Sequence, residues 1–195
     1  MKINSIAVFC GSSMGTQDIY RETAYNLGQA LAANNIGLVY GGANVGLMGA
    51  VADGTLQAGG KVMGVLPRFL QRKELAHERL SELHLVETMH ERKLMMNNLS
   101  DGIIALPGGF GTLEELFEML TWGQLGLHTK PVAILNVDGF YDTLLRFMET
   151  MTKQGFLKEA NRAMLLVGAT PNEVLHKMQD YTPPAVTKWI TPETA

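Results

Sequence analysis

A glycine-rich stretch at residues 107–115, PGGFGTLEE, most constrains what this chain can fold into, because its two flanks differ in character. The apolar run before it, residues 102–106, is typical of a buried strand bounded by turn residues. The apolar residues after it follow the i, i+3, i+4, i+7 spacing of one helix face: Leu113, Leu116, Phe117 and Leu120. The stretch is therefore predicted to be a tight strand-to-helix turn.

Such a turn is suited to binding an anion. Glycine permits positive φ and lets a ligand approach the backbone closely. The first N–H groups of the helix have no partner within it, and the helix dipole adds positive potential. We therefore expect a phosphate at residues 108–112.

Three carboxylates lie just inside the expected helix: Glu114, Glu115 and Glu118. The spacing of Thr112 and Glu115 matches a capping box, in which the Glu side chain reaches back to the N-cap N–H. A turn that attracts an anion is a poor place for surplus carboxylates, unless one of them faces an electron-poor group. Capping and catalysis both stay open for Glu115 on this evidence.

Strand-like and helix-like segments alternate along the chain. This order predicts one α/β domain, Rossmann-like and doubly wound, with helices on both faces of a parallel sheet. Strands are expected at residues 3–9, 36–40, 61–66, 83–87, 102–106, 131–136 and 165–168. Helices are expected at 18–34, from 47 to about 58, at 89–100, after the glycine turn, and at 140–153 and 171–180. The domain is expected to span 1–180, followed by a loose tail at 181–195.

Three glycine-rich turns, at 11–15, 41–49 and 108–111, follow expected strands. Ligands of parallel sheets bind beyond the carboxyl ends of the strands, so the turns should converge on one crevice. They contain neither a Walker motif nor the dinucleotide fingerprint. A nucleotide-sized anion is predicted, and neither ATP hydrolysis nor a dinucleotide cofactor.

Arg92 and Lys93 share a helix face with Met89 and Met96. Two cations within an apolar stripe can be side chains that extend to the surface, the commoner fate of Lys and Arg. They can equally be phosphate or base ligands, since arginine offers forked donors and lysine a point charge.

The motif at 107–115 resembles the Pro-Gly-Gly-x-Gly-Thr-x-x-Glu signature of the LOG ("Lonely Guy") family, whose members are often mislabelled lysine decarboxylases. The similarity extends to residues 10–13, 41–49, 89–93 and 121–122, and covers roughly residues 3–180. It implies hydrolysis of the N-glycosidic bond of an adenine-type nucleoside 5′-monophosphate, giving free base and ribose 5-phosphate.

The resemblance also implies which residues form the site. Arg92 and Glu115 would be catalytic. The implied substrate contacts are Glu74, Arg92, Lys93, Gly108, Gly109, Phe110, Gly111, Thr112, Leu113, Glu114, Glu115 and Thr121. No metal or redox cofactor is implied, and a homodimer is expected. Whether AMP or an N6-prenylated nucleotide is the substrate stays open.

Two other functions fit parts of the sequence. A non-catalytic nucleotide-binding sensor or carrier needs only the glycine turns, whereas the joint presence of Arg92 and Glu115 favours an enzyme. Pyridoxal-dependent lysine decarboxylation would need Lys93 as Schiff-base lysine, in a setting unlike that of such enzymes.

Composition narrows the partners. With 18% charged residues and a formal charge of −3, the chain has no basic excess that would indicate nucleic acid or a membrane surface. No run approaches the about 20 apolar residues of a membrane span. The single cysteine, Cys10, fits a reducing cytoplasm, and we expect it to be a small buried apolar side chain. The five histidines show no metal-ligand spacing.

Overall fold

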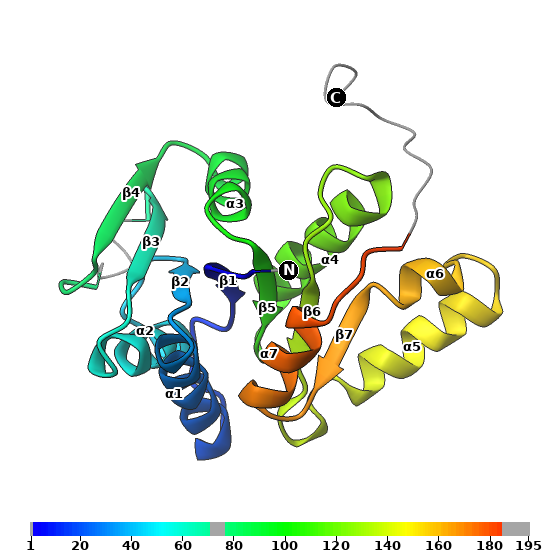
Figure 1. Cartoon of the computed structure of the whole chain (residues 1–195), viewed down its shortest axis with the longest axis horizontal. Coiled ribbons are helices and arrows are strands. Elements are labelled where there is room, and N and C mark those ends of the chain that lie inside the picture. The colour runs from blue at the N-terminus through cyan, green and yellow to red at the C-terminus, as the bar shows by residue number, and fades with distance from the viewer. Residues whose placement is uncertain (1, 71–76, 185–195) are drawn as a thin grey trace.

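A computed structural model describes residues 2–70 and 77–184. Seven parallel strands form one sheet in the order β4-β3-β2-β1-β5-β6-β7 (Figure 1). The strands are β1 (Ser5–Phe9), β2 (Gly37–Tyr40), β3 (Val62–Pro67), β4 (Glu82–Val86), β5 (Gly102–Ala105), β6 (Val132–Leu135) and β7 (Leu165–Gly168).

Strand order reverses between β1 and β5. The chain moves from β1 through β2 and β3 to the edge strand β4, and then returns to β5 on the other side of β1. Val8 of β1 pairs with Tyr40 of β2 and with Ile104 of β5. The helices that follow β1 and β5, residues 18–33 and 110–125, cover opposite faces of the sheet, and ligands of such sheets bind at the carboxyl ends of the strands where the order reverses.

Helices cover both faces of the sheet (Figure 1). One face is covered by α1 (Asp18–Ala33), α2 (Gly46–Gln57) and α7 (Pro171–Gln179), and the other by α3 (Met89–Asn98), α4 (Phe110–Leu125) and α5 (Asp142–Lys153). Side chains alternate along each strand: Val8 packs with the α1 group and Phe9 with the α3 group. Both faces are therefore buried, as the continuous apolar strand sequences require.

The predicted α/β class, the parallel sheet and the principal helices are confirmed. The turn expected at 138–139 is the 3-10 turn η1 (Val137–Gly139), and the short helix α6 (Glu159–Arg162) was not predicted. The predicted tail falls partly outside the described residues, which end at position 184. None of the helices in the described ranges is long and apolar enough to cross a membrane.

Candidate functional site

The three glycine turns are joined to one another by backbone hydrogen bonds. Gly11, directly after β1 and Cys10, donates from its N–H to the carbonyl of Pro107 at 3.0 Å. Its own carbonyl accepts from the N–H of Leu47, in the first turn of α2, also at 3.0 Å. The predicted convergence is thus confirmed, and the turn after β1 lies between the other two.

Close approach at this junction requires glycine. A Cβ atom at Gly46, whose φ is +57°, would lie 2.2 Å from the backbone carbon of Ser12. One at Gly108 would lie 2.1 Å from the hydroxyl of Thr112. The turns can therefore pack backbone against backbone only because these side chains are missing.

A cavity of about 370 Å³ opens beside the junction, within the size range of small-molecule sites. One wall is apolar, with Met48, Leu70, Met89 and Met96. The polar lining residues are Ser12, Arg92, Glu114, Glu115 and Thr112, and the start of α4 from Phe110 also borders the cavity. Phe9, Cys10 and Gly41, which end or follow β1 and β2, also line the cavity.

Helix α4 begins at the cavity, and its start differs from the capping box that was considered. The N-cap is Gly109, which has no side chain to accept from the first-turn N–H groups. Thr112 is already the third helical residue, is buried, and packs its hydroxyl over Gly108. The capping-box interpretation of Glu115 is therefore wrong, and the N–H groups at the start of α4 stay available to an anion.

Arg92 reaches the cavity from α3 and is fixed by backbone carbonyls. Its Nε donates to Val65 O of β3 at 3.1 Å, and its Nη2 donates to Gly41 O at 3.3 Å. Its Nη1 lies 3.6 Å from Oε1 of Glu115. Because a guanidinium has five N–H donors, at least two remain for a ligand.

Glu115 projects from α4 toward Arg92, and its carboxylate is nearly buried. Burial raises the pKa of Glu115 to about 7, although the Arg92 charge acts in the opposite direction and limits the rise. The neighbouring carboxylate of Glu114 raises this pKa further. Glu115 therefore exchanges a proton near neutral pH, as a group in acid–base chemistry must.

Lys93, next to Arg92 on α3, is buried against α4. Its Nζ lies 2.5 Å from Oε1 of Glu114 and 2.9 Å from Oε2 of Glu118. Burial alone would lower the pKa of Lys93, but contacts with these two carboxylates outweigh it and the pKa is raised. Lys93 is therefore a fixed ammonium beside the cavity.

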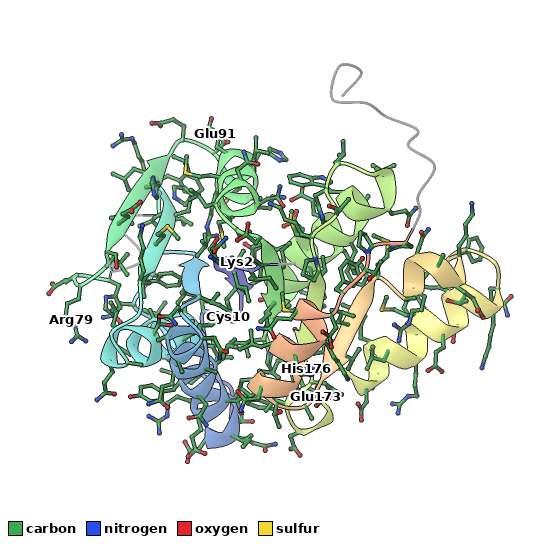
Figure 2. The ribbon with its side chains drawn as sticks, viewed as in Figure 1. Lys2, Cys10, Arg79, Glu91, Glu173 and His176 are labelled. Atoms are coloured by element: carbon green, nitrogen blue, oxygen red, sulfur yellow. The ribbon has the colours of Figure 1, made fainter. Side chains whose placement is uncertain are left out.

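Cys10 lies in the interior of the molecule, near the middle of the view in Figure 2. Burial raises the pKa of its thiol, the Glu115 charge raises it further, and the Arg92 charge lowers it. A thiol with a raised pKa is a poor nucleophile. Cys10 is buried, as predicted, but it also lines the cavity, which the sequence did not indicate.

Comparison with known proteins identifies the family. Residues 48–178 match the sequence model of a family described as "Possible lysine decarboxylase". The chain is 45% identical over 182 residues to the cytokinin riboside 5′-monophosphate phosphoribohydrolase LOG3 of Arabidopsis thaliana, covering 93% of this chain and 85% of that protein. LOG4 of the same plant is 46% identical with the same coverage. The chain belongs to the LOG family.

Solved structures share this LOG-family fold at lower identity. The molybdenum cofactor binding protein from Rippkaea orientalis superposes with a TM-score of 0.69 at 24% identity, covering 92% of this chain and 98% of that one. The molybdenum cofactor carrier protein from Chlamydomonas reinhardtii gives 0.71 at 20% identity, with the same coverage. These likenesses concern the fold alone.

Most residues that the LOG resemblance implied lie at this cavity. Its described lining includes Arg92, Gly109, Phe110, Gly111, Thr112, Glu114 and Glu115. Lys93 and Gly108 are not among the described lining residues, but each contacts one of them. Lys93 pairs with Glu114, and Gly108 lies under the Thr112 hydroxyl. Leu113 follows in α4 and packs against the α3-side core, and Thr121 is exposed and donates its hydroxyl to Phe117 O at 2.7 Å. Glu74 lies outside the described residues.

Sequence reasoning missed the apolar wall of the LOG-family cavity as a unit. Met48, Leu70 and Met89 come from α2, from the segment after β3, and from α3. Gly41 was part of a predicted turn, but its contact with Arg92 was not predicted. Chain position could have identified two of the lining residues. Cys10 and Gly41 each directly follow a strand that ends at the crevice.

Proposed function

We propose that this protein hydrolyses the N-glycosidic bond of an adenine-type nucleoside 5′-monophosphate, releasing the free base and ribose 5-phosphate. One observation carries the proposal: a buried Arg92–Glu115 pair lies beside an uncapped helix N-terminus in a nucleotide-sized cavity. The names of the LOG-family relatives, phosphoribohydrolases of cytokinin riboside 5′-monophosphates, support the same reaction.

The chemistry follows from how this bond breaks. The bond between the anomeric carbon and the base nitrogen breaks with both electrons leaving on the base, so the sugar becomes oxocarbenium-like. Glu115, as a carboxylate, stabilises that charge, holds ribose hydroxyls, and accepts a proton from the water that attacks the anomeric carbon. Arg92 orients the nucleotide and assists the leaving base with its free N–H donors, and Lys93 adds positive potential.

The 5′-phosphate is the part of the substrate that the glycine turn recognises. The N–H groups of Phe110 and Gly111 start α4 beside the cavity, and Gly109 leaves them uncapped. Anchoring the phosphate there fixes the reacting bond relative to Glu115. Such positioning can supply about 7–11 kcal/mol of the barrier.

Two rival functions explain fewer of the contacts. A nucleotide sensor or carrier needs no carboxylate of raised pKa buried against an arginine, and such a group is costly unless it is used. Lysine decarboxylation through a Schiff base needs a neutral amine at Lys93. The contacts of Lys93 with Glu114 and Glu118 instead favour the protonated ammonium.

The base is expected to be adenine, either unmodified, as in AMP, or carrying an N6-prenyl group. The thioether wall formed by Met48, Met89 and Met96 offers an adaptable apolar surface to either base. The two substrates are therefore compared directly in the experiment below.

We also propose that the protein is a homodimer of the cytoplasm. Phe110, at the cavity mouth, is 94% exposed, and Leu94 of α3 is half exposed, so a second copy of the chain would shield apolar surface close to the site. A buried unpaired thiol at Cys10 suits a reducing compartment. Light scattering coupled to gel filtration tests the dimer.

The test is hydrolysis of AMP and of isopentenyladenosine monophosphate, followed by chromatography of the released base. The Glu115→Gln variant should lose about 10²- to 10⁴-fold in turnover, the usual worth of an acid–base group. Nucleotide binding, measured by calorimetry, should be largely retained. Equal turnover by wild type and variant would assign Glu115 a structural role, and binding without any base release would favour a carrier.

A further inference from the structure

Charged side chains from α3 and α4 form two neighbouring groups of ion pairs beside the cavity, each called a rung below. The first rung is Arg92 with Glu115, and the second is Lys93 with Glu114 and Glu118. Arg92 and Lys93 are consecutive, so the ammonium of the second rung is tied through α3 to the guanidinium of the first. On α4, Glu114 and Glu115 are consecutive, and Glu118 lies four residues after Glu114.

The two carboxylates that contact Lys93 differ in how far they are exposed to solvent. The Lys93 side chain is 5% exposed, that of Glu118 is 20% exposed, and that of Glu114 is 56% exposed. Glu114 lines the cavity, whereas Glu118 is not among the described residues that do so. Glu114 is therefore the outer partner of Lys93, at the edge of the cavity, and Glu118 is the inner partner.

A buried ammonium that loses its carboxylate is costly, so Lys93 needs a partner that stays in place. Oε2 of Glu118 is shielded from solvent and has no hydrogen-bond partner within the described ranges. Its compensation is the attraction of Lys93, 2.9 Å away. Glu114 and Glu118 are one helical turn apart and would repel each other if the cation were absent.

We infer that Glu118 is a positioning residue: it holds Lys93 against α4 and so keeps Glu115 opposite Arg92. This inference rests on the proposed hydrolase function. Without the Glu118 carboxylate, Lys93 keeps its ion pair with Glu114 and its charge still acts on Glu115, and both glutamates line the cavity. Lys93 would then compete with Arg92 for Glu115, and the acid would move from its place beside the anomeric carbon.

A purely structural salt bridge between α3 and α4 would have a different signature. It would change the melting temperature and leave kcat and KM unaltered, although loss of the Glu118 charge would still lower the pKa of Glu115. Glu115 is faced by Arg92 and Lys93 of α3, by Glu114 and Glu118 of α4, and by Cys10 at the end of β1. A change at Glu118 alters one charge of this set and the partner of another.

The experiment measures kcat and KM for AMP between pH 5 and 9 in the wild type, Glu118→Gln and Glu118→Asp. The control is Glu173→Gln on α7. Its carboxylate lies 2.6 Å from Nζ of Lys177, four residues further along the same helix. Glu173 lies on the opposite side of the molecule from α3 (Figure 2). Melting temperatures establish that each variant is folded.

Glu118→Gln should lower kcat by about 10- to 100-fold, the cost of a catalytic group displaced by up to about 1 Å, with KM within about threefold of wild type. The pH range over which kcat rises, its pH limb, should move to lower pH, because a negative charge near Glu115 is gone. Glu118→Asp, which keeps the charge, should return the limb to the wild-type position with an intermediate kcat. The Glu173→Gln control should match wild type in kcat, KM and the position of the pH limb.

The inference is overturned if Glu118→Gln has the kcat of the control, even if its pH limb is displaced, because the lost charge alone moves the limb. It is also overturned if Glu118→Asp leaves the limb as displaced as Glu118→Gln does. Should Glu118→Gln fail to fold, Glu118→Ala takes its place, and an unchanged kcat in that variant contradicts a positioning role. A wild type that releases no base contradicts the proposed function itself, which separates the two failures.

Discussion

The guanidinium of Arg92 occupies the space that a side chain at position 41 would fill. A Cβ atom built on Gly41 would lie 2.0 Å from Nη2 and 3.2 Å from Cζ of Arg92. The same arginine donates to the carbonyl of Gly41 at 3.3 Å. The second glycine turn therefore serves Arg92, in addition to its junction with the turn after β1.

Replacing Gly41 by Ala should damage catalysis more than folding. The nearest atom belongs to the end of a flexible side chain, so Arg92 can move aside, but it then leaves Glu115. We expect kcat to fall by about 100-fold, with the midpoint of urea unfolding close to wild type. Gly37→Ala is the control, because a Cβ there meets atoms no closer than 3.6 Å. Full activity in Gly41→Ala would show that the fixed position of Arg92 is dispensable.

The pH dependence of turnover should report Glu115. With a pKa of about 7 and the carboxylate as the working form, kcat/KM should rise about tenfold per pH unit below pH 6 and level off above pH 8. Arg92 lowers this pKa, so Arg92→Gln should move the limb to higher pH in addition to reducing the rate. A limb that stays in place in Arg92→Gln would mean that another group titrates.

The free energy of unfolding should fall as the pH rises, whereas turnover should increase. The pKa of Glu115 is raised in the folded state from its usual 4.5 to about 7, so the folded protein binds this proton more tightly than the unfolded chain. The contribution is complete below pH 4.5 and is lost as the pH rises to 7, by about 3 kcal/mol in total. Relative to Glu115→Gln, which cannot titrate, wild type should therefore lose about 2–3 kcal/mol between pH 5 and 8. Urea unfolding at the two pH values measures this difference, and parallel curves would contradict it.

The junction of the glycine turns should be intolerant of any side chain at position 46. A Cβ there meets the backbone of Ser12 at 2.2 Å and needs φ near +57°, and neither can relax by moving a side chain. Gly46→Ala should lower the free energy of unfolding by about 2–4 kcal/mol through strain and overpacking. Gly37→Ala again serves as the control under identical urea titration. A loss below 1 kcal/mol in Gly46→Ala would show that the turns can separate without cost to the fold.

Local patterns determined much of this protein. The apolar runs gave the strands, the 3.6-residue spacing placed Arg92 and Lys93 on one helix face, and the three glycine turns indicated the crevice. These inferences succeed because strand and helix periodicity depend on residues a few positions apart. The capping-box interpretation of Glu115 was wrong because a Thr-x-x-Glu pattern fits more than one helix start. The structure begins α4 at Phe110 with Gly109 as the N-cap, and the Thr112 hydroxyl lies over Gly108.

What the sequence by itself determined is the α/β class, the glycine turns and the set of charged residues that follow them. Tertiary structure alone decided how those residues act. Arg92 is held by carbonyls 27 and 51 residues away in the chain, and the proton affinity of Glu115 depends on burial between separate segments. Contacts over such separations, and the loss of water that they cause, leave no periodic trace in the residues themselves, because desolvation is a property of the packed site.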